Sequence, residues 1–277
     1  MGALRIMFVR RKGNKFYLVE NKRIKGKVKQ KTVKYLGVNP TKDNEYLPKL
    51  GIVHHASVQK TLSKMPDNSC DCIIADPPYF ISQNRVFSRK EKNLQRHFGN
   101  WDEGDYRKFF ESWLSDCFRV LKHNLFIFTR FELIQYLAEL YPKQYKTTLV
   151  WHKTNPTPHF QKNTFISACE PVLFFQKKKG IFNFQSVNEM HNFKETPVER
   201  RKKVRFHPTQ KHEDLIEWLI KVGSNKNGLV LDLFAGSATT SRVAKKLGRN
   251  FIGVEDDDIY VRKSRKILNG VKDQKNI

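Results

Sequence analysis

Residues 229–255 constrain the fold more than any other stretch of the chain. An apolar run at 229–234 leads through small residues into a helical pattern that ends near Gly248. A second apolar run, at 251–254, is closed by Glu255. Strand, small-residue turn, helix, strand and acid in this order make up half of a doubly wound nucleotide-binding fold. We therefore predict an α/β fold with a doubly wound, mostly parallel sheet.

The turn in this stretch narrows the kind of ligand that it would bind. It lacks the Gly-x-Gly-x-x-Gly and Gly-Lys-Ser/Thr patterns that hold dinucleotides and triphosphates. Small residues let a ligand approach the backbone, and the start of the helix offers unbonded N–H groups. An acid placed like Glu255 suits a pair of ribose hydroxyls. A nucleoside without phosphates fits these features, and S-adenosylmethionine is one such compound.

A second motif, Asp76-Pro77-Pro78-Tyr79, follows the short apolar run at 72–75. An apolar run of this length that stops at a double proline is typical of a buried strand. Asp76 is then expected at the carboxyl edge of the sheet, where open α/β folds bind their ligands. The prolines have a fixed φ and no N–H, so their carbonyls are rigidly placed acceptors. A carboxylate, a rigid carbonyl and a stacking ring together suit an aromatic amine.

The remaining periodicity supports the same fold class. Apolar residues recur at helical spacing at 58–65, 105–122, 132–141, 213–222 and 259–268. Short apolar runs predict further strands at 52–55, 125–129, 147–152 and 172–175. We expect the strands that end at Asp76 and Asp232 to be neighbours, because ligands of such sheets bind where the strand order reverses.

Charge is the strongest global signal in the composition. The chain has 52 Lys and Arg against 27 Asp and Glu, a net charge of +25, which points to a polyanionic partner, above all nucleic acid. No apolar stretch is long enough to span a membrane, and the amino terminus lacks the apolar core of a signal peptide. The four Cys include no Cys-x-x-Cys pair, so we expect no metal site, reduced thiols and a cytoplasmic protein.

Four motifs in a fixed order carry a resemblance to a known family. They are Asp-Pro-Pro-Tyr at 76–79, Trp-His-Lys-Thr-Asn-Pro-Thr-Pro at 151–158, His-Pro-Thr-Gln-Lys at 207–211 and Asp-Leu-Phe-Ala-Gly-Ser-Ala-Thr-Thr at 232–240. The chain resembles the β-class of amino-methylating DNA methyltransferases, in which the catalytic half precedes the cofactor half. The resemblance covers about residues 50–270. It implies a Rossmann-like methyltransferase sheet with S-adenosylmethionine as the cofactor.

The resemblance also implies a role for each motif residue. The catalytic residues would be Asp76, Pro77, Pro78 and Tyr79. The cofactor-binding residues would be Asp232, Phe234, Gly236, Ser237, Thr239, Glu255, His207, Thr209, Gln210 and Lys211. Within this set, Phe234 and Gly236 would form the turn that packs on the cofactor, and Glu255 would bind its ribose.

The chain is expected to divide into two parts. Residues 1–40 are predicted to form a small basic β module, with strands near 6–9, 16–19 and 28–36, that contacts phosphates. Residues 41–277 would form the methyltransferase domain. Within that domain, residues 177–206 show little periodicity and take the place of a target-recognition segment.

The expected reaction is methylation of an exocyclic amine in DNA. Such an amine is a poor nucleophile because its lone pair is delocalised into the ring. Asp76 and the Pro77 carbonyl would accept its N–H groups, and Asp76 would stabilise the positive charge that develops on nitrogen. The base must leave the duplex to reach this site, where Tyr79 would stack on it.

Asp at the first motif position goes mostly with adenine N6 in this family, and Ser with cytosine N4. We therefore predict a site-specific adenine-N6 methyltransferase that acts on double-stranded DNA. A homodimer and a cognate restriction endonuclease, as in a restriction-modification system, are the further partners that the resemblance suggests. Cytosine-N4 methylation, an RNA-directed enzyme and a non-catalytic DNA-binding relative are the alternatives.

Two departures from the family pattern motivate the non-catalytic alternative. Ala238 stands where the family usually has Gly, and its methyl group would tighten the turn. Ala56-Ser57 stands where the family tends to place an Asp near the adenine of the cofactor. A Ser can still form a hydrogen bond there, but with a lower expected affinity.

Overall fold

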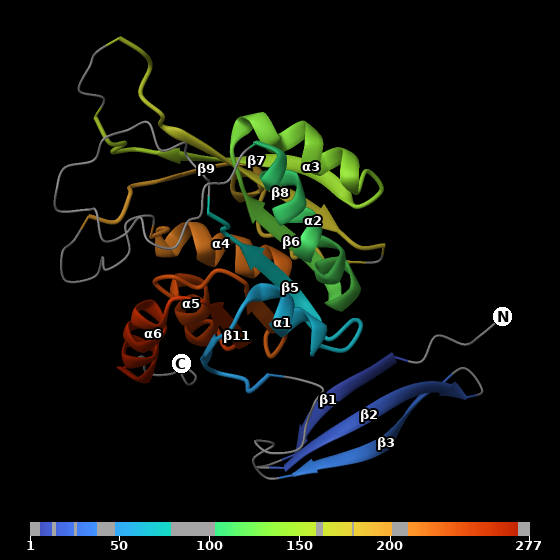
Figure 1. Cartoon of the computed structure of the whole chain (residues 1–277). Helices are drawn as coiled ribbons and strands as arrows, with labels where there is room; N and C mark the ends of the chain where they lie inside the picture. The colour runs from blue at the N-terminus through green and yellow to red at the C-terminus, as the bar shows by residue number, and fades with distance from the viewer. Residues whose placement is uncertain are drawn as a thin grey trace.

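The computed structural model describes residues 6–12, 15–24, 27–37, 48–78, 103–158, 163–178, 180–200 and 210–270. Within these residues the chain forms an eight-stranded sheet flanked by helices and a separate three-stranded sheet (Figure 1). The small sheet consists of β1 (Ile6–Lys12), β2 (Lys15–Ile24) and β3 (Lys27–Gly37), paired antiparallel in that order. The strands predicted for the basic amino-terminal module are therefore confirmed.

The large sheet has the strand order β4-β11-β10-β5-β6-β8-β7-β9. Its strands are β4 (Val53–His55), β5 (Cys70–Ala75), β6 (Leu121–Phe128), β7 (Tyr145–Lys153), β8 (Cys169–Gln176), β9 (Phe193–Thr196), β10 (Leu229–Asp232) and β11 (Asn250–Glu255). The five from β4 to β6 are parallel, β8 is antiparallel to both β6 and β7, and β9 is parallel to β7. The predicted doubly wound, mostly parallel α/β sheet is confirmed.

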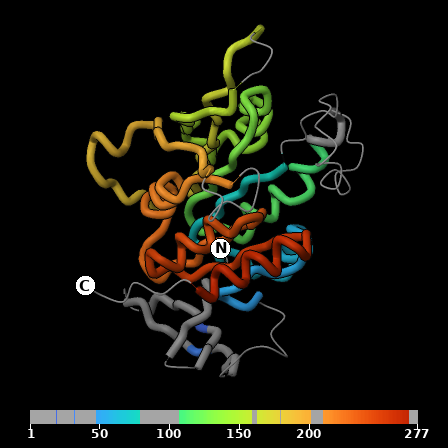
Figure 2. Tube along the Cα trace, turned by 90° about the vertical axis from the view of Figure 1, so that its left-hand side faces the viewer, coloured from blue at the N-terminus to red at the C-terminus, as the bar shows by residue number. Residues whose placement is uncertain are grey.

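Helices cover both faces of this sheet. They are α1 (Val58–Ser63), α2 (Glu103–Val120), α3 (Ile134–Leu140), α4 (Glu213–Gly223), α5 (Thr239–Lys246) and α6 (Asp258–Gly270). Figures 1 and 2 show α5 and α6, coloured red, running side by side, and Lys245 donates to the Leu268 carbonyl between them at 3.2 Å. None of the helices in the described part of the chain has both the length and the apolar character needed to cross a membrane.

The core divides into two apolar clusters because successive strand residues point to opposite faces. In β5, Cys72 and Ile74 pack with α4, α5 and α6, whereas Ile73 and Ala75 pack with α1, α2 and α3. Phe126 and Trp113 are among the largest fully buried side chains, one in each cluster. Apolar residues on both faces of β5 explain why it reads as a continuous apolar run.

The observed bounds differ from the predicted ones mainly between α2 and β6. The predicted helix at 105–122 ends at Val120, and the next strand begins at once with Leu121 instead of residue 125. The prediction of Gly248 just past the end of a helix is confirmed, since its φ is +70° and the cap residue of α5 is Leu247. Strand β9 was not predicted, because its half-exposed edge position leaves no apolar pattern in Phe193–Thr196.

Candidate active site

Three acids meet at the carboxyl edge of the parallel strands. Asp76 directly follows β5, Asp232 ends β10 and Glu255 ends β11. Strand β10 lies between the other two and pairs with both, through Asp232 opposite Ile74 and opposite Gly253. The prediction that the strands ending at Asp76 and Asp232 are neighbours is confirmed, so both motifs face one site.

Asp232 is buried and is held by the start of α5. Its Oδ2 accepts hydrogen bonds from the Ser241 hydroxyl at 2.9 Å and from the Ser241 backbone N–H at 3.2 Å. Burial raises the pKa of Asp232 to about 7; the Ser241 hydrogen bonds oppose this effect, and the negative charges of Glu255 and Asp76 add to it. Asp232 therefore anchors the start of the helix, and its raised pKa leaves it only partly ionised near neutral pH.

Glu255 organises the turn that follows β10. Its Oε2 accepts from the Gly236 N–H at 2.7 Å, and its Oε1 accepts from the N–H groups of Asp257 at 3.0 Å and Asp256 at 3.1 Å. Gly236 has a φ of +45°, which favours a residue without a Cβ. Burial raises the pKa of Glu255 to about 7, against the hydrogen bonds from the backbone of Asp257 and Gly236.

These two raised pKa values predict an unusual pH dependence of stability. Asp232 and Glu255 titrate near 7 in the folded chain but near 4 when unfolded, so the folded state binds more protons between these values. Their contribution therefore destabilises the ligand-free protein as the pH rises from about 4 to about 7. Urea unfolding from pH 5 to pH 8 should show the Asp232→Asn, Glu255→Gln double variant gaining stability relative to the wild type. If the difference in the free energy of unfolding between the two proteins stayed constant across this pH range, the raised pKa values of Asp232 and Glu255 would be wrong.

The turn before α5 contains the first departure from the family pattern. Ala238 has a φ of +54° and is fully buried, and its carbonyl accepts from the Arg242 N–H at 2.9 Å. The left-handed conformation explains why Gly is the usual residue, but an Ala methyl is accommodated. Beside it, the hydroxyls of Ser237 and Thr239 lie 2.9 Å apart, and both residues are buried at the start of the helix.

We expect Ala238→Val to lower the free energy of unfolding by at least about 2 kcal/mol, because a β-branched side chain fits neither the left-handed backbone nor the filled space. Ala238→Gly removes the strain of the left-handed backbone but raises the conformational entropy of the unfolded chain. These effects oppose each other, so the free energy of unfolding should change by less than about 1 kcal/mol. Denaturant unfolding of the two variants checks both values. A Val variant as stable as the wild type would show that the turn is not restricted.

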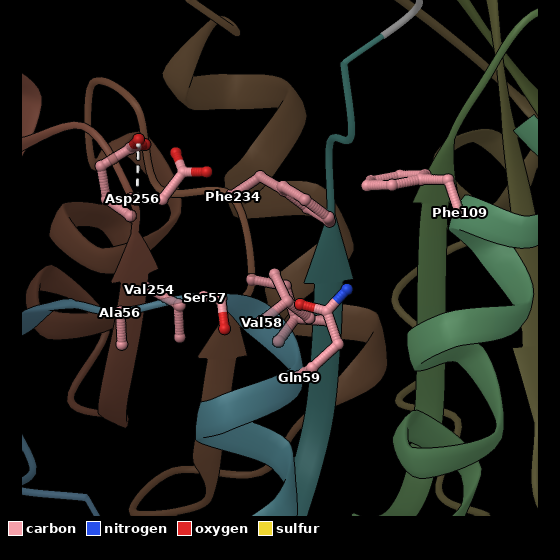
Figure 3. Close-up of a pocket in the computed structure, with 10 residues that line it drawn as sticks. Ala56, Ser57, Val58, Gln59, Phe109, Phe234, Val254 and Asp256 are labelled. Carbon is pink, nitrogen blue, oxygen red and sulfur yellow. Dashed lines mark hydrogen bonds between the residues drawn. The ribbon is translucent and has the colours of Figure 1, made fainter. Parts of the chain in front are cut away.

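A pocket lies beside Glu255, between the ends of β10 and β11 and the start of α1 (Figure 3). Phe234 and Phe109 enter it from opposite sides, and Gln59 of α1 lies below the space between them in the view (Figure 3). The two rings have their centroids 6.1 Å apart. Its lining residues are Ala56, Ser57, Val58, Gln59, Phe109, Leu233, Phe234, Val254, Glu255 and Asp256. Aromatic walls beside a carboxylate suit a planar base attached to a ribose.

Ser57, the second departure, lines this pocket and also caps α1. Its hydroxyl oxygen accepts from the Lys60 backbone N–H at 3.2 Å. A Ser at the N-cap stabilises the helix start, as an Asp in the same place also would. The substitution therefore leaves the start of α1 intact at the pocket wall.

Lys211 connects the second half of the chain to Asp76. Its Nζ lies 2.9 Å from Asp76 Oδ1 and 2.7 Å from Glu170 Oε1. Burial by itself would lower the pKa of Lys211, but the carboxylates of Asp76 and Glu170 raise it above its ordinary value. Lys211 therefore stays charged in the site, and it contacts the residue predicted to be catalytic.

Two buried polar atoms on segments at this edge lack a hydrogen-bond partner within the described part of the chain. They are Thr129 Oγ1, just after β6, and Gln210 Oε1, just before α4. Orphan buried polar atoms in a native structure call for a ligand or a water. Neither atom lines the pocket beside Glu255; within that pocket, the Phe234 ring and the Glu255 carboxylate fit a nucleoside cofactor of the predicted kind.

Some of the predicted site residues lie outside the described residues, namely Tyr79, His207 and Thr209. Other residues at the site were not predicted. Phe109 was assigned to the core, and Gln59 and Glu170 were not singled out. Glu170 had a visible signal, because it is an isolated acid at the start of an apolar run.

Comparison with known proteins gives a consistent result. A family model described as DNA methylase matches residues 70–266. The Type II methyltransferase M.HinfI of Haemophilus influenzae is 32% identical over 241 residues, which cover 78% of this chain and 67% of that protein. The Type II methyltransferase M2.DpnII of Streptococcus pneumoniae is 31% identical over 262 residues, covering 87% and 97%.

Solved structures of methyltransferases share the fold. M1.HpyAVI in complex with SAM has a TM-score of 0.61 and 27% identity, and the match covers 79% of this chain and 98% of that one. The PvuII DNA methyltransferase, described as cytosine-N4-specific, has a TM-score of 0.64 at 16% identity over 85% and 91% of the chains. The similarity to the PvuII enzyme, at 16% identity, concerns the fold alone.

Proposed function

The chain belongs to the DNA methylase family, and from this premise we propose that it transfers the methyl group of S-adenosylmethionine to the N6 amine of an adenine in double-stranded DNA. The observation that carries this proposal is the convergence of Asp76 with Asp232 and Glu255 on adjacent strands. We assign the chain to the β-class, because its catalytic motif precedes its cofactor motif.

We place the cofactor in the pocket beside Glu255. The Glu255 carboxylate would hold the ribose hydroxyls, Phe234 would contact the base, and Gly236 would allow close approach of the backbone. Asp232, Ser237 and Thr239 would lie beside the methionine part, and Gln210 offers an amide oxygen. Once bound, S-adenosylmethionine supplies an electrophilic methyl group.

Asp76 performs the central step on the DNA side. Its carboxylate accepts an N–H of the adenine amine, and the Pro77 carbonyl accepts the other, so that the nitrogen lone pair turns out of the ring plane. As the new N–C bond forms and the S–C bond breaks, the negative charge on Asp76 stabilises the positive nitrogen. The surplus proton then leaves the nitrogen for solvent. No covalent bond to the protein is required.

Adenine is favoured over cytosine by the Asp at the first position of the motif. The net charge of +25 supports DNA as the polyanion, with the module at residues 1–40 as an additional phosphate contact. Residues 177–206 are proposed to contribute to target recognition. The homodimer, the restriction endonuclease partner and the cytoplasmic location stay predictions.

Methyl transfer from labelled S-adenosylmethionine to a DNA mixture that covers all short sequences tests the proposal. Mass analysis of the digested nucleosides should show N6-methyladenine. Methylated cytosine would contradict the choice of base. Absence of label in DNA, with label in a parallel RNA reaction, would contradict the choice of polymer. Absence of label in both would contradict the proposed enzyme.

A further inference from the structure

A row of alternating charges runs from Asp76 into the large sheet; we call it the charge row. It consists of Asp76, Lys211, Glu170 and Lys153, with Lys211 between the two carboxylates and Lys153 Nζ 3.0 Å from Glu170 Oε2. The side chains of Lys211 and Glu170 are only 6% and 8% exposed. Contacts shielded from water to this extent act more strongly than surface ion pairs.

Two aromatic rings enclose the middle of the charge row. The Lys211 ammonium lies 4.8 Å from the centroid of the Phe128 ring and 5.7 Å from that of Trp151. The Trp151 indole N–H donates to Thr196 Oγ1 at 2.8 Å, which ties the ring to β9. These contacts hold the ammonium in one place and keep water from it.

Glu170 is anchored more firmly than Asp76 or Lys211, the other two members of the charge row at the proposed catalytic site. It lies in β8, which pairs with β6 on one side and with β7 on the other, and it stands opposite Trp151. Asp76 and Lys211, by contrast, lie in connections, one just after β5 and the other just before α4. A carboxylate on an inner strand gives Lys211 a fixed partner.

We propose that Glu170 is a positioning residue for methyl transfer, acting through Lys211 to fix the Asp76 carboxylate. This inference rests on the proposed function. Lys153 balances the charge of Glu170, so the contribution of Glu170 is to fix where the Lys211 ammonium meets Asp76.

The charge of Glu170 and its shape can be separated by two variants. Glu170→Gln keeps the shape and removes the charge, whereas Glu170→Asp keeps the charge and shortens the side chain. We expect the Gln variant to lose about 10- to 100-fold in kcat, with KM for the cofactor changed less than about threefold. The Asp variant should retain more of kcat than the Gln variant. A role in packing alone would give the reverse order.

A double variant tests whether the effect passes through Lys211. In a Lys211→Met background, adding Glu170→Gln should change kcat by less than about threefold, because the connection to Asp76 is already broken. Asp71→Asn is the matched control: Asp71 is a partly buried acid in β5, at the end of the strand opposite Asp76, and it accepts from the Leu229 N–H at 2.6 Å. Its kcat should equal that of the wild type.

Thermal unfolding of every variant accompanies the kinetics. A wild-type kcat in Glu170→Gln, a Gln variant more active than the Asp variant, or losses that multiply in the double variant would each overturn the inference while leaving the proposed function in place. A wild-type protein that methylates no DNA would overturn the proposed function itself, and the inference with it.

Discussion

Asp76→Ala should lower kcat for methyl transfer to DNA by about a thousandfold, because it removes the carboxylate that accepts the amine N–H and stabilises the positive nitrogen. The side chain lies at the end of β5 beside Asp232 and contacts the buried Lys211. Affinity for S-adenosylmethionine should change less than about threefold, since the pocket residues beside Glu255 are untouched. Transfer of labelled methyl groups at saturating DNA and cofactor measures kcat, and calorimetry measures the affinity.

The Asp71→Asn control, in the strand that directly precedes Asp76, shows whether a change in β5 by itself affects the reaction. Asp76→Asn adds a further comparison, because it keeps an acceptor oxygen but loses the charge. Full activity in Asp76→Ala would rule out the assigned mechanism. A collapse of cofactor binding together with kcat would place Asp76 in the binding of the cofactor instead.

Glu255→Gln should weaken binding of S-adenosylmethionine by roughly 10- to 100-fold. Hydrogen bonds to a charged acceptor contribute about 1.5–3 kcal/mol, and an amide cannot replace both carboxylate oxygens toward ribose hydroxyls and the Gly236 N–H. Titration calorimetry gives Kd directly. The kcat at saturating cofactor should fall far less than Kd rises.

The wild-type Kd should also depend on pH, because the pKa of Glu255 is raised to about 7. The ionised carboxylate is the better acceptor, so affinity should increase about tenfold from pH 6 to pH 8, and the increase should be smaller in Glu255→Gln, where Asp232 is the remaining acid with a raised pKa. Asp258→Asn is the control, since this nearby acid pairs with Arg262 at the start of α6. Wild-type affinity in Glu255→Gln would exclude the proposed ribose contact.

Most strands and helices were predictable because their signals are local. The apolar run at 229–234, the small residues after it and Gly248 each specify a short piece of backbone through side-chain size and φ preference. The pairing of β5 with β10 also followed, because the topology of doubly wound sheets restricts where two acid-ended strands can lie. Strand β9 was not predicted, because backbone pairing at a sheet edge requires no apolar pattern in the sequence.

The two departures from the family pattern needed the structure for their interpretation. Ala238 looked like a steric obstacle, yet the buried turn holds it at a φ of +54°. Ser57 looked like a weakened ligand contact, yet its hydroxyl caps α1. Whether a residue fits depends on its backbone angles and on the atoms around it, which no local pattern records.

The sequence alone determined the fold class, the two motifs and the acids that end their strands, because each depends on neighbours along the chain. The tertiary structure decided which charges meet. Lys211 was predicted among the cofactor residues, but its ammonium lies between Asp76 and Glu170, which belong to separate segments of the chain. An ion pair between distant segments depends on how strands and loops pack in space, and burial then decides how strongly it acts.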